Sequence, residues 1–195
     1  MKIAAASRKA DLRNEALLRR GALETSVRES FAARLAEQGL ILARRFDASV
    51  VSAFLPIRDE PDTLPLIAAL AARGFRTALP VTVSREAPLI FRQWRPGDPT
   101  LPGGMKIREP LASAVALDPD LLFVPLACFD RRGHRIGFGA GHYDRSLAAL
   151  RAAGSVTAVG VAYGAAQTAE IPDEPHDQRL DFVLTERELI DCRGG

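Results

Sequence analysis

The sequence lacks the features that define several classes of protein. Its two cysteines, Cys128 and Cys192, are too few for a disulfide framework and do not have the spacing of metal ligands. No apolar run is long enough to span a membrane, and the first residues contain no apolar segment like that of a signal peptide. There is no internal repeat and no low-complexity segment. We therefore expect a cytoplasmic protein with no membrane partner.

An excess of charge of one sign is also missing. The 26 Lys and Arg residues nearly balance the 24 Asp and Glu residues, and the formal net charge of +2 gives no reason to expect a nucleic-acid partner. The charges are unevenly placed: residues 1–45 contain ten basic and five acidic residues, whereas 170–191 contain eight acidic and two basic residues. These two segments could face the two ends of one ligand, or both could be ordinary solvated surfaces.

What the sequence does contain is an alternation of strand and helix signals. Short apolar runs predict strands at 50–55, 77–83, 89–94, 121–124, 156–162 and 182–184, and helical spacing predicts helices at about 4–20, 26–45, 63–73 and 143–154. With 195 residues, 47% of them hydrophobic, the chain has the size of one large domain. The alternation predicts a single three-layer α/β domain over residues 1–195, with a mostly parallel central sheet flanked by helices. Its ligand site should lie at the carboxyl ends of strands.

Local signals allow finer predictions. Ser26 followed by Glu29 has the spacing of a capping box for the second helix. Pro80 cannot donate to a strand ladder, so it should lie at a sheet edge or interrupt its strand. Thr185 with Glu188 predicts the cap of a final helical turn. Trp94 is expected to pack in the core or under a loop rather than against a ligand.

The residues that suggest chemistry are concentrated between Asp130 and Arg145, which read DRRGHRIGFGAGHYDR. Gly137, Gly139 and Gly141 alternate between a predicted strand and a predicted helix. Glycine lets successive backbone N–H groups approach an anion, and a helix amino terminus adds partial positive charge. The spacing fits neither a Walker P-loop nor a dinucleotide fingerprint, and the glycines alone would suit a plain tight turn equally well.

Asp144 makes a phosphate site the better interpretation. A carboxylate beside an anion-binding loop suits a divalent cation, because Mg²⁺ bridges carboxylate and phosphate oxygens. The alternative is that Asp144 is simply an acid in the first turn of a helix, where negative charge is favourable.

The stretch from Phe129 to Arg145 resembles the signature of the 5-formyltetrahydrofolate cyclo-ligase family, also called methenyltetrahydrofolate synthetases. Three other stretches resemble elements of that family in the same order along the chain. They are KADLR at 9–13, the loop at 54–62 and DQRLD at 177–181. The resemblance therefore covers nearly the whole chain.

The resemblance implies an ATP- and Mg²⁺-dependent ligase. It would cyclise 5-formyltetrahydrofolate to 5,10-methenyltetrahydrofolate and release ADP and phosphate, and we expect it to act as a monomer. The implied architecture is similar to that of sugar-phosphate isomerases and CoA transferases. By position, the resemblance implies catalytic roles for Arg135 and Asp144; ATP contacts by Lys9, Arg13, Arg135, Gly137, Gly139, Gly141 and Tyr143; folate contacts by Pro56, Asp62, Phe138, Gly139, Ala140, Gly141 and His142; and Mg²⁺ ligation by Asp144 and Asp177.

Four residues depart from the pattern usual in that family. His142 stands where tyrosine is common, and Arg108 stands where proline is frequent. Phe138 and Ala140 remove charge from the glycine-rich stretch. None of the four changes removes an implied metal ligand or a glycine, so activity is expected to survive.

Other functions predict different features. A sugar-phosphate isomerase or a CoA-transferase-like enzyme would use a single acidic base and no ATP. A regulatory or RNA-associated relative would need a basic surface or an added domain, and neither is visible in the sequence. A zinc site would need ligand spacing that His134, His142 and His176 do not have.

Overall fold

A computed structural model describes residues 2–104 and 107–194 of the chain, with side chains from residue 7 onward. The helices are α1 (Lys2–Gly21), α2 (Thr25–Arg45), α3 (Leu64–Ala72) and α4 (His142–Ala153), with a short 3-10 helix η2 (Gly164–Ala166). The strands are β1 (Val50–Ser52), β2 (Arg76–Val81), β3 (Ile90–Gln93), β4 (Thr100–Pro102), β5 (Arg108–Pro110), β6 (Leu121–Pro125), β7 (Cys128–Phe129), β8 (Arg135–Ile136), β9 (Thr157–Val161), β10 (Phe182–Leu184) and β11 (Leu189–Asp191). Within these residues, no helix combines the length and the apolar character needed to cross a membrane.

Seven strands form the central sheet, in the order β11-β10-β9-β6-β1-β2-β3. The five inner strands are mutually parallel, and β3 and β11 pair antiparallel at the two edges. After β1 the chain adds β2 on one side, and later it adds β6 on the other side. The carboxyl ends of β1 and β6 therefore flank the switch point at which open α/β sheets bind ligands. The predicted α/β fold with a mostly parallel sheet is confirmed.

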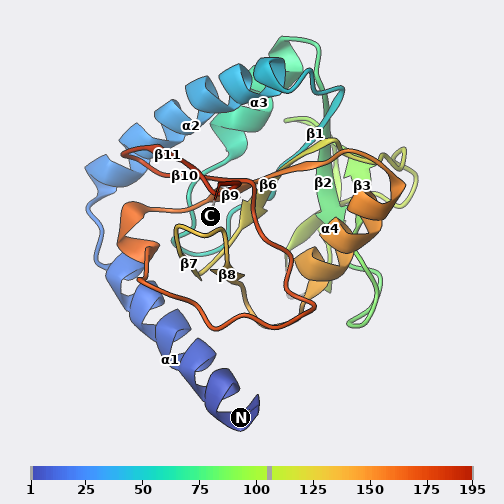
Figure 1. Ribbon diagram of the computed structural model, residues 1–195. Helices are drawn as coiled ribbons and strands as arrows, with labels where there is room; N and C mark the ends of the chain where they lie inside the picture. Colours follow the sequence, from blue (N-terminus) through green and yellow to red (C-terminus); the bar gives the residue numbers. More distant parts are fainter. Residues whose placement is uncertain (1, 105–106, 195) are drawn as a thin grey trace.

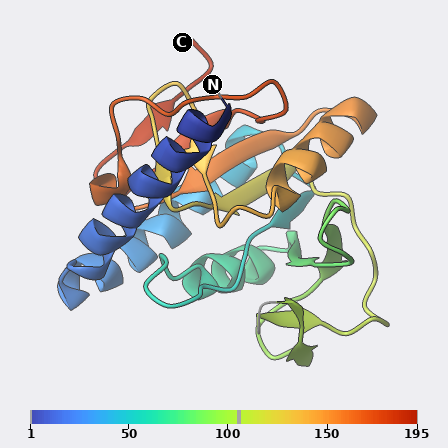
Figure 2. The same ribbon diagram turned by 90° about the horizontal axis from the view of Figure 1, so that it is seen from below.

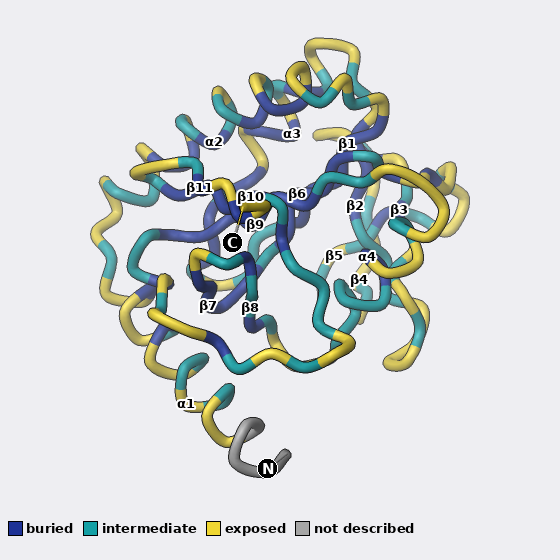
Figure 3. The backbone as a smooth tube through the Cα atoms, in the orientation of Figure 1, coloured by how far each residue is buried: buried dark blue, intermediate teal, exposed yellow. Residues whose placement is uncertain are grey.

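The sheet separates two hydrophobic layers, because successive residues of a strand point to opposite faces. Leu121 and Phe123 of β6 pack in the cluster that contains α2 and α3, whereas Leu122 and Val124 pack in the cluster that contains Leu147 of α4. Figure 1 shows α2 and α3 on one side of the sheet and α4 on the other side. In Figure 3 the central strands are the most deeply buried part of the chain.

Helix α1 lies outside these layers and crosses the carboxyl ends of the strands (Figures 1 and 2). Its residues Leu12 and Ala16 pack in a separate small cluster with Cys128 of β7 and Ile136 of β8. This packing places the polar residues of the same helix beside the glycine-rich stretch that follows β8.

The prediction for Pro80 is wrong, because β2 is unbroken and has β1 on one side and β3 on the other. The carbonyl oxygen of Ala78 accepts a hydrogen bond from Ala53 N, so by alternation the nitrogen of Pro80 also faces the β1 side. Strand β1 ends at Ser52, whose partner is Ala78. Proline is tolerated because no neighbouring strand needs its missing N–H.

Two predictions about caps are also wrong. Helix α2 begins at Thr25, so Ser26 and Glu29 lie inside it, and its first turn has no side-chain cap. Thr185 begins a turn, with its hydroxyl oxygen accepting hydrogen bonds from the N–H groups of Arg187 and Glu188. That turn joins β10 to the antiparallel strand β11 and not to a helix. The same hydroxyl geometry serves a helix cap and a hairpin turn, so the sequence signal was ambiguous.

Two small ribbons, β4–β5 and β7–β8, were not predicted. These strands have two or three residues, and β4, β5 and β8 contain proline or charged residues in place of the apolar run that marks the equally short β1 and β10. The β7–β8 ribbon separates β6 from the glycine-rich stretch. Buried Asp130 holds its turn by accepting hydrogen bonds from the N–H groups of Arg132 and His134.

Candidate active site

A cavity of about 380 Å³ opens at the carboxyl ends of β1, β2 and β6. This volume lies within the range usual for small-molecule sites. One wall is apolar and includes Phe54, Leu55, Leu79 and Leu89. Another part of the lining is polar and consists of residues from α1, the glycine-rich stretch and the acidic segment before β10. The cavity therefore lies where the sequence predicted a ligand site.

Residues 137–141 form the glycine loop that enters α4. Gly139 has φ +92° and Gly141 has φ +68°, a backbone region that residues with a Cβ rarely adopt. Gly137 has no such φ, and a Cβ built on it would meet no protein atom within 4 Å. Two of the three glycines are thus required by backbone geometry, whereas Gly137 faces open space beside the cavity.

Arg13 of α1 supports this loop. Its Nε donates a hydrogen bond of 2.8 Å to the carbonyl oxygen of Gly137. Both residues line the cavity, as do Gly139, Gly141 and Tyr143. Burial raises the pKa of the Tyr143 phenol above its usual range, so this side chain is neutral at physiological pH.

Arg135 and Asp144 form a partly buried ion pair at the base of the loop. Nη2 of Arg135 lies 2.8 Å from Oδ1 of Asp144, and the Arg135 side chain is only 5% exposed. The same oxygen accepts a hydrogen bond of 3.1 Å from the N–H of Gln178, and Nη1 of Arg135 donates to the Gln178 carbonyl. Burial lowers the pKa of Arg135, and the Asp144 carboxylate opposes that effect. Oδ2 of Asp144 accepts no hydrogen bond from the described residues.

Lys9 connects α1 to the acidic segment. Its Nζ lies 2.8 Å from Oδ2 of Asp177 and 3.0 Å from Oε2 of Glu174. The basic amino-terminal region and the acidic carboxyl-terminal region therefore meet each other at the cavity wall. Glu174, His176 and Asp177 have ligand atoms within 4.8 Å of one another, and all three line the cavity. Carboxylate oxygens of this kind suit Mg²⁺, and Asp144 lines the same cavity.

Glu60 is one of the polar groups in the cavity that the sequence did not predict, together with Thr82, Glu109, Glu174 and His176. Its Oε2 accepts a hydrogen bond of 3.0 Å from Ile57 N, whereas its Oε1 is buried without a partner among the described residues. The turn that directs it inward places Arg58 at φ +54°, an unusual value for a residue with a Cβ. Burial raises the pKa of Glu60 to about 7, despite the opposing effects of Ile57 N–H and Arg20.

Two of the predicted folate contacts are not among the residues that line the cavity. Asp62 is turned toward α3, where its Oδ1 accepts a hydrogen bond of 2.9 Å from Leu64 N. Pro56 precedes the inward turn and also lies outside the lining. The loop at 54–62 contributes Phe54, Leu55, Ile57 and Glu60 instead.

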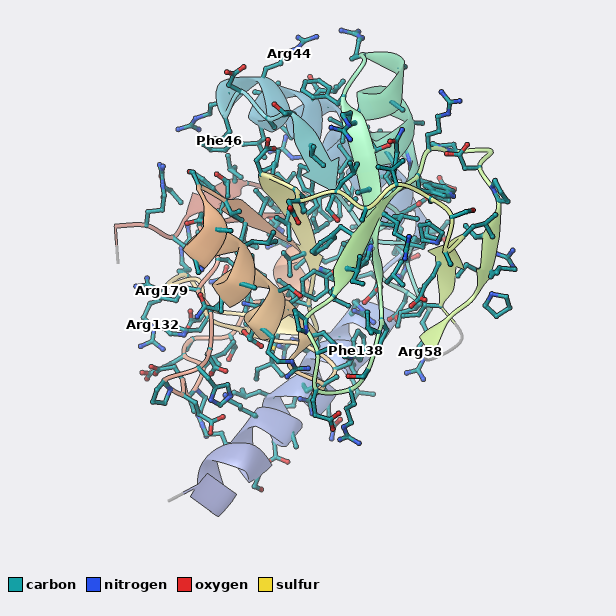
Figure 4. The ribbon with its side chains drawn as sticks, turned by 90° about the vertical axis from the view of Figure 1, so that its right-hand side faces the viewer. Arg44, Phe46, Arg58, Arg132, Phe138 and Arg179 are labelled. Atoms are coloured by element: carbon teal, nitrogen blue, oxygen red, sulfur yellow. The ribbon has the colours of Figure 1, made fainter. Side chains whose placement is uncertain are left out.

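The other predicted folate contacts, at 138–142, all line the cavity. Phe138 is 38% exposed and lies at the same end of the molecule as α1 (Figure 4). Nδ1 of His142 lies 3.3 Å from both the Ala87 carbonyl and Nη2 of Arg145. Arg145 also donates to the carbonyl oxygens of Arg85 and Ala140, so it links the glycine loop to the segment between β2 and β3. The sequence analysis did not identify this linking role.

Trp94 lies apart from the cavity. It is 6% exposed, and its Nε1 donates a hydrogen bond to the Asp98 carbonyl. The prediction that it packs in the core is confirmed.

Comparison with known proteins indicates one family. A model of the 5-formyltetrahydrofolate cyclo-ligase family matches residues 5–186. The chain is 33% identical over 190 residues to a 5-formyltetrahydrofolate cyclo-ligase of Mycolicibacterium smegmatis, which covers 93% of this chain and 95% of the relative. It is 34% identical over 143 residues to an Escherichia coli protein of the same name, covering 71% and 78% of the two chains.

Solved structures agree with the sequence comparisons. The NMR structure of Aquifex aeolicus 5,10-methenyltetrahydrofolate synthetase matches with a TM-score of 0.79 at 26% identity, covering 96% of this chain and 94% of that one. A synthetase of the same name from Mycoplasma pneumoniae has the same fold, with a TM-score of 0.69 at 21% identity over 95% and 99% of the chains. The resemblance noted in the sequence is thereby confirmed, and the chain belongs to the 5-formyltetrahydrofolate cyclo-ligase family.

Proposed function

We propose that this protein converts 5-formyltetrahydrofolate and ATP to 5,10-methenyltetrahydrofolate, ADP and phosphate, with Mg²⁺ bound to ATP. The observation that carries the proposal is that the lining of one cavity has a polar part and an apolar part. Lys9, Arg13, Arg135 and a glycine loop make up most of the polar part of the lining, whereas apolar side chains make up another part, and the lining also includes the buried carboxyl group of Glu60. The polar part suits a triphosphate, and the apolar part suits a flat heterocycle with polar edges.

The reaction requires a formyl oxygen to become a leaving group. That oxygen attacks the γ-phosphorus, the bond from the γ-phosphorus to the β,γ-bridging oxygen breaks, and ADP leaves. N10 then attacks the formyl carbon, the carbon–oxygen bond to phosphate breaks, and N10 loses its proton. The product is a cyclic amidinium cation. The protein's work in these steps is mainly positioning and charge neutralisation.

Lys9, Arg13 and Arg135 are the proposed phosphate-binding side chains, and the contacts that hold them in place support this role. Lys9 and Arg135 are already held by carboxylates, and Arg13 is held by the Gly137 carbonyl. Side chains held in this way lose little freedom when an anion arrives. Gly137, Gly139, Gly141 and Tyr143 would complete the ATP contacts.

Asp144 and Asp177 are the proposed Mg²⁺ ligands, and Glu174 is a candidate third ligand. When bound, Mg²⁺ would neutralise negative charge on the transferred phosphoryl group. Oδ2 of Asp144 has no hydrogen-bond donor among the described residues. Oδ2 of Asp177 accepts hydrogen bonds from Lys9 and from Glu174 N, so Oδ1, which lies 3.7 Å from Nε2 of His176, is the oxygen proposed for the metal ion.

Glu60 is proposed to contact the folate. Its unpartnered buried oxygen can accept a hydrogen bond from folate, and a carboxyl group with a pKa of about 7 is suited to take the proton that N10 loses. Phe138, Gly139, Ala140, Gly141 and His142 would contact folate from the loop side.

The test is to mix the protein with 5-formyltetrahydrofolate, ATP and Mg²⁺ and to follow the absorbance of the methenyl product. ADP should form in a 1:1 ratio with that product, and omission of ATP or Mg²⁺ should stop the reaction. Full turnover without a nucleotide would contradict the proposed mechanism. A sugar-phosphate isomerase reaction would proceed without ATP, so the same omission distinguishes that alternative.

A further inference from the structure

One cation in the cavity wall is not explained by phosphate binding. Lys9, Arg13 and Arg135 are all bonded to the glycine loop or to acidic residues beside it. The fourth, Arg108, comes from β5, in a different part of the fold. It forms no ion pair with any residue in 7–104 or 107–194.

The side chain of Arg108 has a defined orientation even though the residue is exposed. Its Nε donates a hydrogen bond of 2.6 Å to Oγ1 of Thr100, and its Nη2 donates one of 2.7 Å to the Thr100 carbonyl. Thr100 lies on the neighbouring strand β4. Nη1 has no partner among the described residues, so the guanidinium keeps free donors for a carboxylate.

The neighbouring Glu109 forms no ion pair with Arg108. Its Oε1 accepts a hydrogen bond of 3.0 Å from Thr82 N, and its side chain packs against Gly103. An unneutralised cation at the wall of a ligand cavity attracts an anionic group of the ligand.

The position of β5 in the fold indicates which anionic group of the ligand can reach Arg108. The residues proposed to bind phosphate come from α1, the glycine loop and the acidic segment, whereas β5 contacts β2. Figures 2 and 3 show α1 and the β4–β5 ribbon on different sides of the molecule. The formyl group must meet the γ-phosphate, so the glutamate of the folate, at the far end of its aminobenzoyl group, extends away from the phosphates.

We propose that Arg108 binds a carboxylate of the glutamyl chain of the folate and thereby favours glutamylated folates over pteroates that lack glutamate. This assignment rests on the proposed function. The bond would anchor the tail after the pterin and formyl groups have entered the cavity. Because the interaction lies at an exposed position, salt would weaken it.

The test compares two substrates with two proteins. The substrates are 5-formyltetrahydrofolate and 5-formyltetrahydropteroate, which lacks the glutamate, and the proteins are wild type and Arg108→Gln. Glutamine can still donate to Thr100 but carries no charge. We expect kcat/KM for the folate to fall about 3- to 10-fold through a higher KM, which corresponds to one exposed charge-assisted bond. We expect kcat/KM for the pteroate and the KM for ATP to stay the same.

Arg95→Gln is the matched control, because Arg95 is exposed, pairs with Asp98 and does not line the cavity. It should affect neither substrate. Arg108→Lys should keep part of the preference for the folate. Equal losses with both substrates in Arg108→Gln, or no loss with the folate, would overturn the proposal. Failure of wild-type protein to form methenyl product from either substrate would instead overturn the proposed function.

Discussion

The ammonium group of Lys9 lies 2.8 Å from the carboxylate of Asp177, so an expected phosphate ligand is bonded to an expected metal ligand. The two side chains are 17% and 19% exposed, which makes the pair stronger than a fully exposed one. Glu174 completes the arrangement on the other side of Lys9. We infer that this cluster serves both ligands, with the Lys9 ammonium group held in place for phosphate and the Asp177 carboxylate held in place for Mg²⁺.

This relationship predicts the effect of replacing Lys9. Lys9→Met should raise the KM for ATP about 10-fold or more, because a charge-assisted bond to phosphate is lost. The KM for 5-formyltetrahydrofolate should change much less. Arg8→Met, at the adjacent exposed position of α1, is the control and should leave both constants unchanged. Equal rises in both KM values would show that Lys9 supports the whole cavity and does not bind ATP in particular.

The metal prediction concerns Asp144. Asp144→Asn keeps one oxygen to accept from Arg135 and Gln178, so the protein should fold normally. It loses the charge that attracts Mg²⁺, so the Mg²⁺ concentration needed for half-maximal rate should rise strongly. A titration of activity with Mg²⁺ measures this directly. Asp181→Asn is a useful control, because Asp181 pairs with Arg151 and does not line the cavity. A folded Asp144→Asn enzyme with a normal Mg²⁺ requirement would remove Asp144 from the metal site.

The sequence identified the polar wall of the cavity far better than the apolar one. The residues proposed to bind phosphate belong to a contiguous glycine stretch, which local pattern indicated, and to one helix turn, where only the family resemblance indicated Lys9 and Arg13. The folate wall depends on which of three acids, Asp59, Glu60 and Asp62, points inward. That choice is made by a turn in which Arg58 adopts φ +54°, and no residue type marks such a turn in the sequence.

The same limit explains the errors in the fold. The inner parallel strands were predicted because they lie in continuous apolar runs, and the helices were predicted because their spacing extends over many residues. The β4–β5 and β7–β8 ribbons depend on tertiary pairing of two or three residues, which leaves no periodic trace. Arg108, which stood out only as a departure from the family pattern, acquires a role only once β5 is seen to line the cavity.

The glycine loop allows a test of the tight-turn interpretation. Gly139→Ala should destabilise the protein by about 1 kcal/mol, because alanine is strained at φ +92°. Gly137→Ala should leave the melting temperature unchanged, since its Cβ would enter open space. If that space holds phosphate, Gly137→Ala should nevertheless weaken ATP binding several-fold. Unchanged ATP affinity in the alanine variant at 137 would favour the simple turn.

Arg145 gives a prediction about the segment between β2 and β3. Arg145→Ala removes hydrogen bonds to the carbonyl oxygens of Arg85, Ala87 and Ala140. We expect trypsin to cleave after the exposed Arg85 faster than in wild type, because local opening becomes easier. Arg151→Ala, on the last turns of the same helix, should not change cleavage at that bond. Unaltered cleavage in the Arg145 variant would show that Ser146, which bonds Leu89, is sufficient to hold the segment.

The last prediction concerns Glu60 and pH. Burial raises the pKa of this carboxyl group from 4.5 to about 7, so the folded protein binds a proton that the unfolded chain has already released. Between these two values the stability contributed by Glu60 therefore falls as pH rises, by about 3 kcal/mol in total at 1.36 kcal/mol per pKa unit. Glu60→Gln has no ionisable group, so its free energy of unfolding should fall less than that of wild type between pH 4.5 and 8.

Chemical denaturation of both proteins at pH 4.5 and 8 measures this difference, and the exposed Glu37→Gln variant should behave like wild type. The activity of wild type should change in the opposite direction. A base must be ionised to take the N10 proton, so kcat should rise through pH 7, and Glu60→Gln should have a low rate without that rise. If stability follows pH as expected but the two proteins keep equal rates, Glu60 is a buried acid beside the folate and takes no part in proton transfer.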